Sequence, residues 1–160
     1  MSGGAFAAIR PDEWNFPLLV HVLGAMILVG GVATTATVQF LGWRRPAPAD
    51  ALPLARMAFR ALLFVAIPGW IVMRVGADWI ASKEGLDGER VPDWVDVGFV
   101  AADLGGALLL VATLLGWFAA RRLRRSDTGS AWPIRISTVL VTAVLVGYLV
   151  AVWAMTAKPS

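Results

Sequence analysis

The stretch LLVHVLGAMILVGGVATTATVQ, residues 18–39, decides the fold of this chain. It carries no charge, and as an α-helix it would extend for about 33 Å, enough to cross a hydrocarbon core of about 30 Å. At about 100° per residue, one narrow face of this helix gathers most of its small and polar side chains. The residues on that face are His21, Gly24, Leu28, Gly31, Thr35 and Gln39. Because polar groups in hydrocarbon must turn toward protein, this face is expected to form the inner wall of a helix bundle.

The rest of the chain has the same apolar character. Hydrophobic residues make up 58% of its 160 residues, and the mean hydropathy is +0.71. Four apolar stretches predict membrane-spanning helices over about 17–42, 51–81, 95–125 and 132–157. Since the connections are short, we expect an all-α integral membrane protein, in which residues 1–160 form one domain of four transmembrane helices in an up-and-down bundle. Pro68 and Gly69, in the middle of the second stretch, predict a kink.

The distribution of charge predicts how the bundle is oriented. Arginines concentrate in the first connection, at 44–45, and before the third, at 121–125, whereas the segment 82–91 is acidic. Because Lys and Arg favour cytoplasmic loops, both arginine-rich connections are expected in the cytoplasm and both termini outside. The expected location is the bacterial inner (cytoplasmic) membrane. The arginines would anchor the helix ends and, in addition, contact anionic lipid.

Several classes of function are excluded by the composition. The chain has no cysteine, which rules out disulfides, thiolate ligands and cysteine nucleophiles. It also lacks a glycine-rich phosphate loop, an HExxH-type zinc motif and an aromatic-plus-basic RNA-binding pattern. The net charge of +3 reflects sidedness, so no nucleic-acid partner is expected. The partners that fit are the lipid bilayer, a second copy of the chain or another membrane protein.

The predicted topology brings the ionisable residues of the four spans to the outer half of the bundle. These residues are His21, Arg74, Asp78, Asp103 and Tyr148. A carboxylate two turns deep needs a cation, a donor or a proton, so we expect Asp103 to pair with Arg74. The alternative for Arg74 is a local ion pair with Asp78, four residues later on the same helix.

His21, the only histidine, has two interpretations. It forms a hydrogen bond between helices, or it is a ligand to haem b or copper. In the second interpretation Arg74 would pair with a haem propionate, Trp70 or Tyr148 would supply an aromatic wall, and Asp103 would belong to the same pocket. Gly24 and Gly31 would leave room for a planar cofactor, although small residues at such spacing are also typical of helix packing. The candidates for a second ligand are Met26, Met73 and Met155.

The segment LLVHVLGAMILVGG, residues 18–31, resembles the first helix of small bacterial membrane proteins related to the copper-resistance D and protoporphyrinogen-oxidase-like families. The resemblance implies a multi-helix bundle with copper handling or haem-linked redox chemistry at His21. The chain has no second histidine, which leaves open whether it is an enzyme. The sequence thus favours a polar pocket that opens outward and binds haem or copper. The alternative is a non-catalytic accessory or assembly protein that packs with itself or a partner through small-residue helix faces.

Overall fold

The computed structural model describes residues 15–45, 48–84, 93–125 and 132–157. Every regular element within these ranges is helical. The elements are α1 (Asn15–Trp43), α2 (Pro48–Ala61), the π-helical segment η2 (Leu62–Ala66), α3 (Ile67–Glu84), α4 (Asp93–Arg124) and α5 (Trp132–Ala157). Since α2, η2 and α3 follow one another without a break, they form one long span. The described residues therefore contain four spans where the sequence predicts them, all long and apolar enough to cross a membrane.

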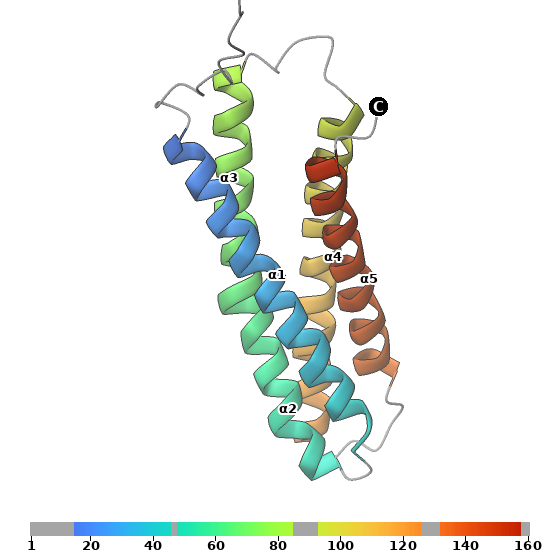
Figure 1. Ribbon diagram of the computed structural model, residues 1–160. Coiled ribbons are helices and arrows are strands. Elements are labelled where there is room, and N and C mark those ends of the chain that lie inside the picture. Colours follow the sequence, from blue (N-terminus) through green and yellow to red (C-terminus); the bar gives the residue numbers. More distant parts are fainter. Residues whose placement is uncertain (1–14, 46–47, 85–92, 126–131, 158–160) are drawn as a thin grey trace, which may run out of the picture.

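The four spans run up and down in chain order (Figure 1). The start of α1, the end of α3, the start of α4 and the end of α5 lie at one end of the bundle, which is the upper end in Figure 1. The opposite helix ends lie at the lower end. The chief partner of α1 is α3, and the chief partner of α4 is α5, while contacts of α1 with α5 and of α2 with α4 join the two pairs. The prediction of an all-α, up-and-down bundle is confirmed.

The exterior of the bundle is apolar and part of its interior is polar. Large apolar side chains such as Met26, Phe64 and Leu114 are about two-thirds exposed. The polar side chains inside are Thr35, Gln39, Thr113, Ser137 and Thr138. The threonine hydroxyls among them donate to the carbonyl four residues earlier in their own helix, which satisfies them without water. This distribution is the one that a hydrocarbon environment requires.

Glycines bring α1 and α3 into backbone contact along a seam. The two helices are antiparallel, and Gly24 faces Met73 while Leu28 faces Gly69. The seam continues into η2, where Gly31 faces Ala66. A Cβ added at Gly69 would lie 2.7 Å from the backbone nitrogen of Leu28, closer than real side chains come. A Cβ at Gly24 would overlap the backbone of α3. The predicted inner face of α1 is therefore confirmed, and the backbone of α3 packs directly against it.

The irregular segment η2 ends two residues before Pro68, the proline predicted to kink the second span. Pro68 has no N–H and cannot donate to the carbonyl four residues earlier, so the regular hydrogen-bond ladder must change at this point. The chain widens into a π-helical turn, in which the N–H of Ile67 bonds the carbonyl of Leu62. Such turns occur as local insertions within α-helices. The proline is thus accommodated inside a continuous span.

Candidate functional site

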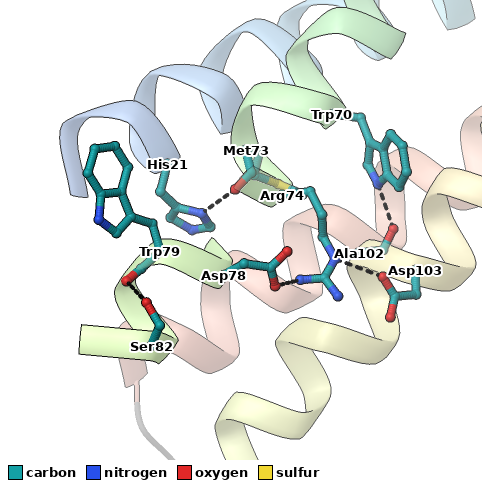
Figure 2. Close-up of polar contacts among 9 residues, drawn as sticks. All are labelled: His21, Trp70, Met73, Arg74, Asp78, Trp79, Ser82, Ala102 and Asp103. Atoms are coloured by element: carbon teal, nitrogen blue, oxygen red, sulfur yellow. Dashed lines mark hydrogen bonds and ion pairs between the residues drawn. The ribbon is translucent and has the colours of Figure 1, made fainter. Parts of the chain in front are cut away.

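His21 lies where α1 packs closely against α3. Gly76 of α3 has no side chain, so the backbone of α1 at His21 can pack against it. The half-buried imidazole points to α3, and its Nδ1 lies 3.0 Å from the carbonyl oxygen of Met73 (Figure 2). A carbonyl only accepts, so Nδ1 carries the hydrogen and donates it. In a neutral ring the lone pair is then on Nε2, the nitrogen that could bind a ligand.

Arg74, one residue after Met73, joins two carboxylates. Its Nε donates to Oδ1 of Asp103 on α4 at 2.9 Å, and its Nη1 donates to Oδ1 of Asp78 (Figure 2). The guanidinium carbon also lies 5.0 Å from the centre of the Phe99 ring, a cation–π arrangement. Both pairings predicted for Arg74 are confirmed, and they form together. We call Arg74, Asp78 and Asp103 the acidic cluster, because two carboxylates share one cation.

The acidic cluster lies on the surface of the bundle. The Asp78 and Asp103 side chains are 58% and 60% exposed, whereas Arg74 is 25% exposed. The neighbours of Asp103 on the outer face of α4 are apolar, with Val100 and Leu104 both more than half exposed. With both carboxylates ionised, the cluster carries a net charge of −1. Such a charge on an apolar span requires a proton, water or a cationic partner nearby.

Trp70 and Tyr148, the two aromatic residues expected to form a cofactor wall, instead pack between neighbouring helices. The indole Nε1 of Trp70 donates to the carbonyl of Ala102 at 2.8 Å, which ties α3 to α4 (Figure 2). The Trp70 ring lies against Gly106, and Tyr148 of α5 lies against Gly105. Tyr148 is only 5% exposed, and its hydroxyl has no hydrogen-bond partner within the described part of the chain. Both rings thus fill space that the two glycines leave on α4.

Gly24 and Gly31 have a clear structural role. The backbone of α3 fills the space beside Gly24, and η2 fills the space beside Gly31, so helix packing accounts for both glycines. A planar group could enter there only if α1 and α3 moved apart. Of the interpretations that the sequence leaves open for these two residues, the geometry supports packing.

The donors around His21 limit what a metal or haem site could contain. Among the described residues, no three His, Cys, Asp or Glu side chains gather as a metal site would require. Met26 is 68% exposed on the outer surface, whereas Met73 is buried at 8% exposure. The side chain of Met155 lies outside the described residues. Among the described residues, the candidate ligand is therefore His21 Nε2, and no group of three His, Cys, Asp or Glu side chains gathers with it.

A second buried polar cluster, at the lower end, was not predicted as a unit. Gln39 of α1 donates to the hydroxyl of Ser137 at 2.8 Å, and that hydroxyl donates to the carbonyl of Ala112 at 3.1 Å. The chain of bonds links α1, α5 and α4. The sequence shows both polar residues inside apolar spans, but only packing reveals that they face each other. The Gln39 Oε1 is buried without a partner among the described residues.

The structure brings three of the predicted site residues to one end of the bundle. His21, Arg74 and Asp103 come to the same end of the bundle, through α1, α3 and α4 (Figure 2). The sequence did not predict the Met73 carbonyl as the hydrogen-bond partner of His21, because a backbone acceptor is present at every residue and leaves no signal in the sequence. Sequence reasoning also missed that Gly69 and Gly76 repeat the seven-residue spacing of Gly24 and Gly31, which was a readable signal for the seam.

Comparison of the chain with family models, curated proteins and solved structures found no match. The resemblance of residues 18–31 to the copper-resistance D and protoporphyrinogen-oxidase-like families therefore stays a prediction from the sequence.

Proposed function

We propose that the chain is a multi-pass protein of the bacterial inner membrane that binds a ligand near the upper end of its bundle, through His21. Four spans of sufficient length and an apolar exterior support the membrane location. The ligand proposed is haem b or copper. The polar residues that accompany the imidazole at this end of the bundle are those of the acidic cluster.

One observation carries this proposal, namely the hydrogen bond from the imidazole to the Met73 carbonyl. Histidine ligands commonly donate their second nitrogen to a carbonyl, which fixes the ring and leaves the other nitrogen ready to bind. A single nitrogen fits axial ligation of haem better than a copper site, which draws on several donors. Haem, when bound, would supply one-electron redox chemistry.

The role expected of Arg74 changes with the structure. Two of its three guanidinium nitrogens already bond carboxylates, so a haem propionate would compete with Asp78 and Asp103 and be repelled by them. We therefore assign Arg74 and Asp103 to joining α3 with α4. In this arrangement they hold in place the helix against which His21 packs.

Replacing His21 tests the proposal. If haem is bound, His21→Ala should abolish or strongly shift the Soret band of the purified protein, because the axial nitrogen is lost. If copper is bound, the same change should lower the retained metal without altering the oligomeric state. Trp70→Phe is the matched control, since it also removes one side-chain bond to a carbonyl of another helix but no potential ligand. Loss of the band or metal in the control alone would contradict the assignment.

The second candidate function is a non-catalytic accessory or assembly protein. Its support is the outer face of α1, where a Cβ added at Gly30 would meet nothing within 4 Å and Thr34 is exposed. Small residues four apart on a free helix face allow another helix to approach closely. If the chain has this function, the purified protein should hold neither a chromophore nor a metal. His21→Ala and Trp70→Phe should then each cost about 1 kcal/mol, as expected for one interhelical hydrogen bond.

The proposed orientation has its own test. The chain lacks cysteine, so Arg45→Cys and Ser82→Cys each introduce a single labelling site near opposite ends of the second span. The arginine asymmetry predicts that an impermeant thiol reagent added outside labels position 82 and not position 45. Labelling of position 45 alone would reverse the orientation and place the His21 end in the cytoplasm.

A further inference from the structure

The lower end of the bundle has a cleft of about 620 Å³ between α2 and α4. This volume lies within the range of small-ligand sites, roughly 300–1,000 Å³. Four of the seven lining residues are arginines. The lining consists of Arg56, Phe59 and Arg60 from α2, and Trp117, Ala120, Arg121 and Arg124 from α4. We call this feature the arginine cleft.

The spacing along each helix explains why the four guanidiniums converge. Arg56 and Arg60 are four residues apart on α2, and Arg121 and Arg124 are three apart on α4, so each pair shares one helix face. The packing of α2 on α4 then sets these faces toward each other. Within the described part of the chain, no carboxylate forms an ion pair with any of the four. Four uncompensated positive charges around one cleft favour an anion there.

Aromatic side chains form the apolar part of the cleft. The Arg121 guanidinium carbon lies 5.2 Å from the centre of the Trp117 ring, which holds this arginine beside the cleft. Trp117 and Arg121 also border a smaller cleft of about 320 Å³, whose other lining residues are Phe118, Arg122 and Arg125. Both clefts therefore combine positive charge with an aromatic wall. An anion that carries an apolar tail matches this combination better than a free ion does.

We propose that the arginine cleft binds the phosphate group of an anionic phospholipid. Guanidiniums bind phosphate oxygens in pairs of hydrogen bonds, and four of them suit a headgroup with one or two phosphates. The cleft lies where the apolar spans of α2 and α4 meet their charged ends, which is the level of lipid headgroups. The acyl chains would then lie along the exposed apolar side chains above it, which include Leu63 and Leu114. This site is separate from His21 and does not depend on the proposed ligand there.

Lipid-dependent stability of the intact, detergent-solubilised chain tests the proposal. The thermal midpoint is measured against increasing short-chain phosphatidylglycerol, with phosphatidylcholine and inorganic phosphate as separate arms. The variant R60Q/R124Q removes one arginine from each wall of the cleft. The control R44Q/R45Q removes the same charge at the same end of the bundle but outside the cleft. All four side chains are exposed, so neither variant should disturb folding.

The expected result is a rise in the thermal midpoint with phosphatidylglycerol alone. The R60Q/R124Q variant should bind this lipid about 25-fold more weakly, since each arginine near an anionic headgroup contributes roughly fivefold. The control should lose much less affinity, because Arg44 and Arg45 can contact anionic lipid but do not line the cleft. An equal loss in the control would reduce the effect to general charge attraction, and an equal response to phosphatidylcholine would remove the role of the anion. A rise in the thermal midpoint with inorganic phosphate equal to that with the lipid would assign the cleft to a free ion. Each of these three results would overturn the proposal.

Discussion

Gly24→Ala should destabilise the protein more than any other single methyl group added to α1. The new Cβ would overlap the backbone of Met73, which cannot move aside as a flexible side chain could. The two helices must separate, so the loss extends to the contacts on either side of Gly24. We expect a cost of at least about 3 kcal/mol, the upper part of the usual range for overpacked cores.

Gly30→Ala is the matched control for this change. Gly30 lies on the same helix, and a Cβ there would meet nothing within 4 Å. Alanine favours a helix over glycine by about 1 kcal/mol, so this variant should be neutral or slightly more stable. Denaturant titration of both variants in the same detergent measures the difference. Equal stability of the two would mean that α1 and α3 do not meet along the glycine seam.

Arg74→Gln should produce the second large effect. It removes the one cation that two carboxylates share, and both would remain on apolar spans. We expect a loss of about 3 kcal/mol, the scale of the cost of an unpaired charge on a membrane span. Asp103→Asn should cost less, because Arg74 keeps its bond to Asp78.

The double variant shows whether the bond between α3 and α4 carries this energy. Since Asp103→Asn also relieves the excess negative charge, the double variant should lose less than the sum of the single losses, by roughly 1 kcal/mol. Thermal and denaturant unfolding of all four proteins complete the cycle. Strict additivity would contradict the pairing of Arg74 with Asp103 and assign Arg74 to Asp78 alone.

The sequence predicted the spans closely because hydrophobicity and length act residue by residue. The inner face of α1 was also predictable, since the angular position of each residue on a helix follows from its number. Pro68 predicted a kink, and the structure has a π-helical turn before it, whose form depends on which carbonyl the N–H of Ile67 finds. That choice is made by local geometry after the helix has formed.

The candidate site was predictable only in part. The pairing of Arg74 with Asp103 followed from depth and charge, because an isolated carboxylate in an apolar span is costly. The Met73 carbonyl and the arginine cleft required knowing how neighbouring helices are rotated about their axes. A sequence pattern orders helices along the chain and marks their inner faces. It does not say which face of α2 meets α4.

The glycine seam has a consequence for biogenesis. The first half of the chain, α1 to α3, completes its tightest interface from its own residues, and α4 with α5 does the same in the second half. All residues of the glycine seam have therefore been synthesised once the first two spans have left the ribosome. In the proposed bilayer, the first hairpin can close while the second is still being synthesised. The exposed ion pair between Arg74 and Asp103 would then form last, when the preassembled pair α4 and α5 docks onto the preassembled first half.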